Sequence, residues 1–244
     1  MITTRALTNH AEFNAAVRLQ QEIWGFDEIE LLPVRLFVVA TKIGGQAFGA
    51  YDGERMVGFC LAIPGLKPGG NYYLHSHMLG VRREFRNAGV GRLLKLRQRE
   101  EAMSRHIGLI EWTFDPLEIK NAYFNMERLG AIVRRYVVNQ YGTTSSHLHG
   151  GLPTDRCTAE WWLESSRVRA VLDGNKPDRE PIEARITVPS NIAKLREVEP
   201  AKAREIQLRI SEEFREAFDR NLAVTGFERA DDEGTYLLGP WQYS

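Results

Sequence analysis

One segment constrains the fold of this chain more than any other. An apolar run ends at Val81, a charged turn follows, and two glycines, Gly89 and Gly91, lead directly into a stretch with helical periodicity. Backbone N–H groups in the first turn of a helix have no partner inside the helix, and the helix dipole is positive there. Because glycine has no Cβ, an anion can approach the backbone closely at these positions. The segment therefore predicts a strand–turn–helix unit with an anion site where the helix begins.

The residues of the turn narrow the kind of anion. The segment lacks the Gly-Lys-Ser/Thr of a Walker A loop, and Arg86 stands where a dinucleotide fingerprint needs its first glycine. A nucleotide-linked diphosphate stays open as the ligand, and so does a purely structural turn. The basic residues around the turn are Arg82, Arg83, Arg86, Arg92 and Lys95. This small cluster suits a phosphate group better than a polynucleotide, because 32 Lys and Arg balance 32 Asp and Glu over the chain.

Hydrophobic periodicity and turn signals predict alternating strands and helices around this segment. The expected strands span residues 2–7, 46–51, 55–63, 72–81, 109–114 and 131–138. The expected helices begin at Asn9, Pro33, Gly89 and Ile119, and Gly130 follows the end of the last one. This order predicts an α/β fold in which helices cover a mixed sheet.

The last third of the chain has a less regular pattern. We expect strands at residues 158–163 and 183–188, a surface linker at 173–181, a long helix at 200–222, and closing strands at 224–228 and 235–238. This content is sufficient for a smaller second subdomain.

Composition limits the class of protein. Two cysteines, Cys60 and Cys157, exclude a disulfide scaffold, and no stretch approaches the roughly 20 apolar residues of a membrane span. The first residues lack the features of a signal peptide. His147 and His149 have metal-like spacing but no accompanying Cys, Asp or Glu cluster, so no metal is expected. We therefore expect a cytoplasmic protein that binds neither nucleic acid nor membranes; the oligomeric state, a homodimer included, stays open.

Two motifs resemble those of the GNAT superfamily of N-acyltransferases. Residues 86–91 match the acyl-CoA-binding pattern Arg/Gln-x-x-Gly-x-Gly/Ala of that family at every position. The segments 121–124 (Asn-Ala-Tyr-Phe) and 129–131 (Leu-Gly-Ala) are similar to its second motif. The resemblance covers residues 1–165 and implies a GNAT acyltransferase domain with a central mixed β-sheet flanked by helices. Residues 166–244 would then form an αβ C-terminal extension.

The resemblance also implies a cofactor and its binding residues. The co-substrate would be acetyl-CoA or another acyl-CoA, and its pantetheine arm would pair with the fourth strand at Leu79, Gly80 and Val81. Asn121 and Phe124 would flank the thiol end. The pyrophosphate would lie on the turn formed by Arg86, Asn87, Ala88, Gly89, Val90, Gly91 and Arg92.

A general base is expected on the fourth strand. His77 stands four residues before Val81, where several GNAT enzymes carry a Glu base, and imidazole suits proton removal at neutral pH. Glu111 is the second candidate and His75 the third, while a buried structural role for His77 stays open. Strand alternation would place His75, His77 and Leu79 on one face, with Ser76 and Met78 on the other.

One position departs from the family pattern. Many members have a Tyr four residues before the Gly of Leu-Gly, as the acid that protonates the CoA thiolate, whereas this chain has Met126. Tyr123 lies one helical turn earlier and is a possible substitute. Water or another residue would otherwise protonate the thiolate, or the protein does not catalyse.

The sequence therefore predicts an N-acyltransferase that moves an acetyl or succinyl group from acyl-CoA to the amino group of a small amine or amino acid. A succinyl group would need a cation near the thioester, for which Arg134 or Arg135 is a candidate. The alternatives are a non-catalytic acyl-CoA sensor or regulatory module, and a nucleotide-phosphate binder unrelated to CoA.

Overall fold

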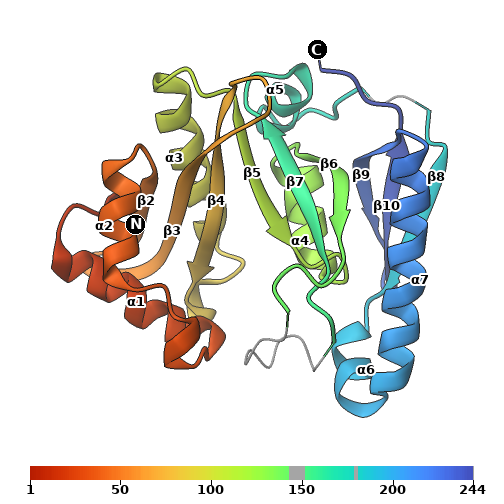
Figure 1. Cartoon of the computed structure of the whole chain (residues 1–244), viewed down its shortest axis with the longest axis horizontal. Helices are drawn as coiled ribbons and strands as arrows, with labels where there is room; N and C mark the ends of the chain where they lie inside the picture. The colour runs from red at the N-terminus through yellow and green to blue at the C-terminus, as the bar shows by residue number, and fades with distance from the viewer. Residues whose placement is uncertain (143–151, 179–180, 244) are drawn as a thin grey trace. The chain divides into compact units, whose positions relative to one another are not determined.

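The computed structural model describes residues 1–142, 152–178 and 181–243. The chain forms two compact units, Met1–Glu111 and Trp112–Ser244 (Figure 1). These compact units do not test where one domain ends and the next begins. The predicted division into a domain at 1–165 and an extension at 166–244 therefore stays a prediction.

The first unit is a sheet with helices on both faces. Its elements are β1 (Ile2–Ala6), α1 (His10–Trp24), α2 (Val34–Lys42), β2 (Gln46–Asp52), β3 (Arg55–Leu66), β4 (Tyr72–Val81), α3 (Val90–Ser104) and the start of β5 (Leu109–Phe114), with short 3-10 turns at Glu28–Glu30 and Arg83–Phe85. β1 to β4 pair antiparallel in chain order, and β4 pairs in parallel with β5. The predicted strands and helices of this unit are confirmed.

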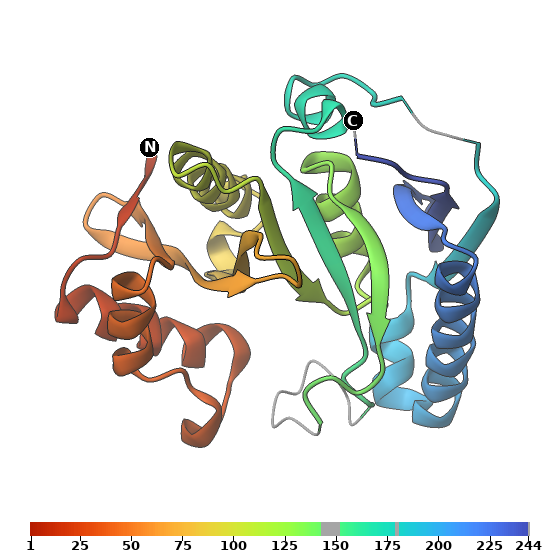
Figure 2. The ribbon, with the colours of Figure 1, turned by 45° about the horizontal axis from the view of Figure 1, so that its top comes forward.

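Two hydrophobic clusters lie on opposite faces of this sheet. Phe13 of α1 and Phe37 of α2 pack against Phe59 of β3 in one cluster. Val90 and Leu94 of α3 pack against Cys60, Phe48 and other residues in the second. Figure 2 shows α3 on one side of the sheet and α1 with α2 on the other. Alternating strand side chains thus fill both layers, as the period of a strand requires.

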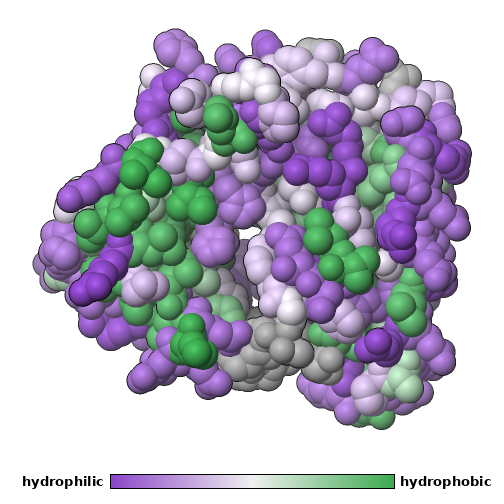
Figure 3. Space-filling model, viewed as in Figure 1, coloured by the Kyte–Doolittle hydropathy of each residue, from purple (hydrophilic) through white to green (hydrophobic). Residues whose placement is uncertain are grey.

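Outward-facing hydrophobic residues lie on α2 and directly after it. Val39 of α2 and Ile43, its C-cap residue, are about half exposed, and Figure 3 shows hydrophobic residues gathered over this helix. Among the helices of the described ranges, none is long and apolar enough to cross a bilayer.

β4 contains a bulge that changes its alternation. Leu61 lies opposite Met78 and Ala62 lies opposite Ser76, so His77 is the extra residue. Met78 packs in the cluster with α1 and α2, whereas Leu79 packs with α3. Ser76 hydrogen-bonds to residues of α3, so it shares a face with Leu79. The predicted pairing of Leu79 with the histidines, and of Ser76 with Met78, is therefore wrong, because a bulge inserts one residue into the period.

The second unit has a sheet in the order β7-β6-β9-β10-β8. Its elements are α4 (Ile119–Tyr123), a π-helical turn (Phe124–Arg128), β6 (Ile132–Val137), β7 (Arg156–Trp162), α5 (Ser166–Leu172), β8 (Ala184–Pro189), α6 (Ile192–Val198), α7 (Pro200–Asp219), β9 (Ala223–Arg229) and β10 (Glu233–Gly239). Phe214 of α7 stacks on Tyr136 of β6 and meets Tyr236 of β10 edge-on, so α7 covers this sheet. The strands and the long helix are confirmed, whereas α5 and α6 were not predicted.

The predicted helix from Ile119 ends at Arg128, and Gly130 lies past its end as expected, with a φ of +77°. Its last turn widens into a π-helix, and side chains satisfy the free carbonyls there. Trp161 donates to the oxygen of Leu129 (2.6 Å), and Arg167 donates to the oxygen of Gly130 (3.1 Å).

Candidate functional site

The turn between β4 and α3 presents backbone donors. Asn87 and Gly89 adopt positive φ angles of +63° and +81°, and Gly89 is the N-cap of α3. Gly89 has no side chain to cap the helix, no other described side chain is recorded as bonded to the first N–H groups of the helix, and Gly89 is exposed. The first N–H groups of α3 therefore point out of the helix with the positive end of its dipole, as an anion site requires.

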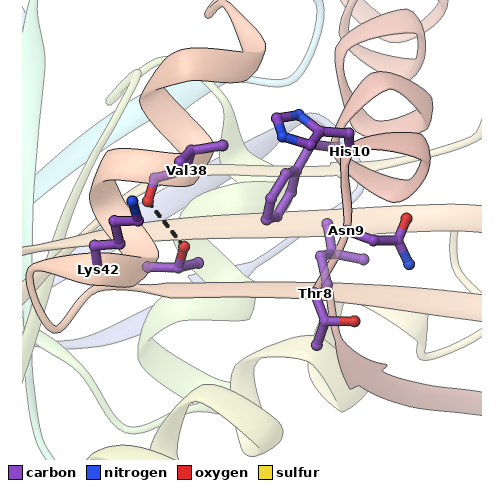
Figure 4. A pocket seen from close by; sticks show the side chains of 8 residues that line it. Thr8, Asn9, His10, Val38 and Lys42 are labelled. Carbon is purple, nitrogen blue, oxygen red and sulfur yellow. Dashed lines mark hydrogen bonds between the residues drawn. The ribbon is translucent and has the colours of Figure 1, made fainter.

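The start of α1 is built differently. The Asn9 side chain accepts a hydrogen bond from the Glu12 N–H (3.0 Å), and the Glu12 carboxylate accepts one from the Thr8 N–H (2.7 Å). A pocket of about 450 Å³ lies beside this cap, between the start of α1 and the end of α2 (Figure 4). Thr8, Asn9, His10, Val38 and Lys42 line it, and no predicted site residue does. At α1 the Asn9 side chain thus satisfies the N–H of Glu12, whereas no side chain of the described residues is recorded as bonded to the first N–H groups of α3.

The glycines of the turn have room around them. A Cβ at Gly89 would meet no atom within 4 Å, and a Cβ at Gly91 would lie 3.6 Å from Leu79 Cδ2. Packing therefore does not require glycine at position 91. Gly80 is the opposite case, because a Cβ there would lie 2.7 Å from both Ile23 and Trp24 of α1. Glycine at position 80 is needed for packing.

The basic cluster around the turn is smaller than the sequence predicts. Arg82 is paired with Glu22 of α1, and Arg86 donates to the Val81 oxygen (3.2 Å). Arg83 is exposed and Arg92 is half-buried. Lys95 does not belong to the cluster, because it lies in the core and donates to Ser76 Oγ (2.8 Å).

Burial lowers the pKa of Lys95 to about 7. Ser76 Oγ in turn donates to Gln98 Oε1 (3.0 Å), and the backbone oxygen of Gln98 accepts a hydrogen bond from Gln46 Nε2 (2.9 Å). The sequence pattern does not predict this buried polar network. Its signal was Lys95 and Gln98 on the inward side of α3, among Val90, Leu94 and Ala102.

Within the part of the chain that the structure describes, β4 has an open edge next to the turn. It pairs with β5 only at Leu74 with Ile110 and at His75 with Glu111, whereas it pairs with β3 as far as Val81. Along an unpaired edge, alternate residues present backbone N–H and C=O groups to an incoming partner. The predicted pantetheine residues Leu79, Gly80 and Val81 all lie on this part of β4. Their edge can accept an extended ligand with amide groups.

His77 is the bulged residue of β4. Its ring lies 6.0 Å from the ring of His75, so the two imidazoles are neighbours. Burial lowers the pKa of His77 below its ordinary value, because the charged form loses hydration. Burial therefore favours the neutral form of the ring, which is the form that can accept a proton.

Glu111 lies opposite His75 and is 3% exposed. Its carboxylate is 2.6 Å from the ammonium of Lys67, in the turn between β3 and β4. The two predicted bases thus lie near one another, but Glu111 already holds a cation.

The remaining predicted residues lie in the second unit. Asn121 is exposed on α4, and Phe124 is half-buried at the start of the π-turn; their role at the thiol end stays a prediction. Met126 is fully buried, so it contributes packing alone. The Arg229 guanidinium lies over the Tyr123 ring, with its carbon 5.4 Å from the ring centre.

The proposed cations for a succinyl group are paired with a buried carboxylate. Arg134 lies 2.5 Å from Glu160, and Arg135 lies 3.6 Å from the same side chain. Glu160 therefore offsets much of their charge. The described residues contain no group of three or more His, Cys, Asp or Glu that could hold a metal ion. His147 and His149 lie outside the described residues.

Comparison with known proteins identifies solved structures that have a similar fold. No family model matches the sequence, and no curated protein matches it. Solved structures do match. The ribosomal-protein-S18-alanine N-acetyltransferase from Escherichia coli has a TM-score of 0.52 at 16% identity, covering 66% of this chain and 92% of its own. The Arabidopsis thaliana protein Naa50, solved with the bisubstrate analogue CoA-Ac-MVNAL, has a TM-score of 0.52 at 14% identity, covering 65% and 97%.

An acetyltransferase of the GNAT family from Streptococcus pneumoniae is similar to the same extent. Its TM-score is 0.52 at 11% identity, over 66% of this chain and 98% of its own. Identities this low carry information about the fold alone. Together with the mixed sheet and the turn before α3, these likenesses show that the chain has the fold of the GNAT superfamily.

Proposed function

We propose that this protein transfers an acyl group from acyl-CoA to the amino group of a small amine or amino acid. The observation that carries the proposal is the uncapped start of α3 directly after the open edge of β4. The turn from Arg86 to Arg92 offers N–H groups to the pyrophosphate, and β4 offers backbone groups to the amides of the pantetheine arm. The GNAT neighbours, one of them solved with a CoA bisubstrate analogue, support this ligand.

The proposed reaction needs few groups from the protein. The acceptor arrives as an ammonium ion and gives one proton to the neutral ring of His77, with Glu111 as the alternative base. The free amine attacks the thioester carbonyl, a C–N bond forms and the C–S bond breaks. The nitrogen then loses a second proton and the CoA thiolate gains one, by way of water, because Met126 cannot donate. Most of the acceleration would come from positioning the amine against the thioester.

A direct test is release of the CoA thiol. Purified protein is mixed with acetyl-CoA or succinyl-CoA and a panel of amino acids and small amines, and free thiol is measured over time. We expect acceptor-dependent release that the Gly89→Val variant loses. If no pair of donor and acceptor releases thiol, the enzymatic proposal is wrong.

A second candidate function is a non-catalytic acyl-CoA sensor. The observation that favours it is the complete burial of Met126 at the position of the family's Tyr acid. CoA binding without thiol release from any acceptor would support the sensor. A nucleotide-phosphate binder would instead be stabilised by ATP as strongly as by CoA.

A further inference from the structure

The turn between β3 and β4 places one side chain inward. Every residue from Leu66 to Tyr72 is exposed except Lys67. The Lys67 ammonium lies 2.6 Å from the Glu111 carboxylate and 4.6 Å from the centre of the Tyr73 ring. The Lys67 side chain is thus a cation held between a buried anion and an aromatic face.

The groups that hold this cation are fixed in place. Glu111 is 3% exposed and is anchored in the parallel pairing of β4 and β5. The Tyr73 ring lies against Gly65, its partner across the strands, where a Cβ would come within 2.3 Å of it. A carboxylate and an aromatic face at these distances form a binding site for a primary ammonium group, whichever molecule supplies it.

The cation itself is not fixed in the same way. The turn is closed by backbone hydrogen bonds from the Lys67 N–H to the Asn71 oxygen (2.9 Å) and from the Gly70 N–H to the Lys67 oxygen (3.0 Å). These bonds do not involve the lysine side chain, which can rotate into solvent while the turn stays closed. Lysine has a flexible four-carbon stem and a strongly hydrated ammonium, so both positions are accessible.

The site also lies close to the candidate base. His75 is the strand partner of Glu111, and its ring is 6.0 Å from that of His77. An ammonium ion bound at Glu111 would therefore lie in the neighbourhood of the imidazole that is proposed to take its proton. The charged and titratable groups identified around the site are Lys67, Tyr73, His75, His77 and Glu111.

We propose that Glu111 and Tyr73 bind the primary ammonium group of the acceptor, and that Lys67 fills this site in the free protein until an acceptor replaces it. The inference rests on the proposed function and names one part of its site. A buried carboxylate is costly without a cation, so one ammonium replaces another and the charge stays balanced. The acceptor class is thus a primary amine that enters as a cation.

The test uses n-butylammonium chloride as the probe, because it resembles the end of a lysine side chain. Its dissociation constant is measured by thermal shift at constant ionic strength, for the wild type and for Lys67→Ala. A tethered competitor reduces apparent affinity, so we expect Lys67→Ala to bind the probe at least fivefold more tightly than the wild type. Tetramethylammonium, which has no N–H donor, should show no such gain.

Two further variants complete the experiment. Lys42→Ala removes an exposed lysine elsewhere in the same unit and should bind the probe as the wild type does. Lys67→Ala/Glu111→Gln should lose the gain. If Lys67→Ala does not fold, Lys67→Met retains the apolar stem and serves in its place. Equal affinity of the wild type and the Lys67 variant, or a gain that survives Glu111→Gln, would overturn the inference.

CoA affinity is measured on the same variants, because it separates this inference from the proposed function. CoA binding together with no gain in probe affinity would refute the ammonium site alone. Absence of CoA binding to the wild type would refute the proposed function itself.

Discussion

His75 on β4 lies directly opposite Glu111 on β5, and the parallel pairing of these two strands ends with this pair. Two residues after His75, His77 forms a bulge that shifts the register of β4 relative to β3. His77, the candidate base, and the open edge of β4 follow His75 directly, and Glu111, which holds Lys67, is the strand partner of His75. The titratable side chains proposed for the reaction thus lie where the pairing of β4 with β5 ends.

The first prediction concerns His77. If this residue removes the proton, His77→Ala should lower turnover by roughly 10² or more and leave CoA affinity nearly unchanged. The wild-type rate should rise with pH through an apparent pKa below the ordinary histidine value, because burial lowers the pKa of His77. That limb of the pH–rate profile should be absent in the variant.

The matched variant for this prediction is Glu111→Gln. Full activity in His77→Ala together with loss of turnover in Glu111→Gln would assign the base to β5. Full activity in both variants would mean that water removes the proton. Each variant should first be checked for folding by circular dichroism, because losing a buried hydrogen bond can cost about 1–3 kcal/mol.

The second prediction concerns Lys95 and stability. Its pKa is about 7 in the folded protein and about 10.4 in an unfolded chain. Between these values the unfolded state holds a proton that the folded state has released, so the free energy of unfolding rises with pH. The gain should be about 1–2 kcal/mol between pH 7 and 8.5, measured by urea denaturation.

Lys95→Met is the control for this prediction, because it fills similar space without a charge. The difference between the wild type and Lys95→Met should change with pH over this window. The window stops at 8.5 because burial raises the pKa of Cys60 to about 12. Above that pH the unfolded thiol ionises first, and this opposes the effect of Lys95. A pH-independent difference would mean that Lys95 keeps an ordinary pKa.

The third prediction separates packing from ligand binding at two glycines. Gly80→Ala should destabilise the protein by about 1–3 kcal/mol, since its Cβ would lie 2.7 Å from Ile23 and Trp24. Gly91→Ala should leave stability within about 0.5 kcal/mol, because its Cβ would make only an ordinary contact with Leu79. Thermal unfolding of both variants measures the difference. Similar melting temperatures for the two would contradict the packing described here.

Much of the fold follows from the sequence. The strand from Tyr72 to Val81 and the strand from Leu109 to Phe114 are predicted with their observed bounds, because turn residues delimit both. The missed helices α5 and α6 have seven residues each. Two helical turns contain too few residues for hydrophobic periodicity to stand out.

The site is predicted less completely than the fold. The glycine turn is local, so its motif suffices to locate it. The bulge at His77 depends on how β3 pairs with β4, and the pairing of Lys67 with Glu111 joins residues far apart in the chain. The sequence suggests that Lys95 belongs to the basic cluster, whereas its ammonium is buried in the core and donates a hydrogen bond to Ser76. A sequence pattern does not reveal such tertiary contacts.

Titration calorimetry with CoA on three proteins shows whether the turn before α3 binds the pyrophosphate. Gly89→Val places a branched side chain where the pyrophosphate would approach the backbone, at a φ of +81° that favours glycine. Gly108→Val is the control, because a Cβ there would also meet nothing within 4 Å. We predict that Gly89→Val lowers CoA affinity at least tenfold, about 1.4 kcal/mol, while the wild type and Gly108→Val bind alike. Equal affinity in all three folded proteins would mean that the turn before α3 does not bind CoA.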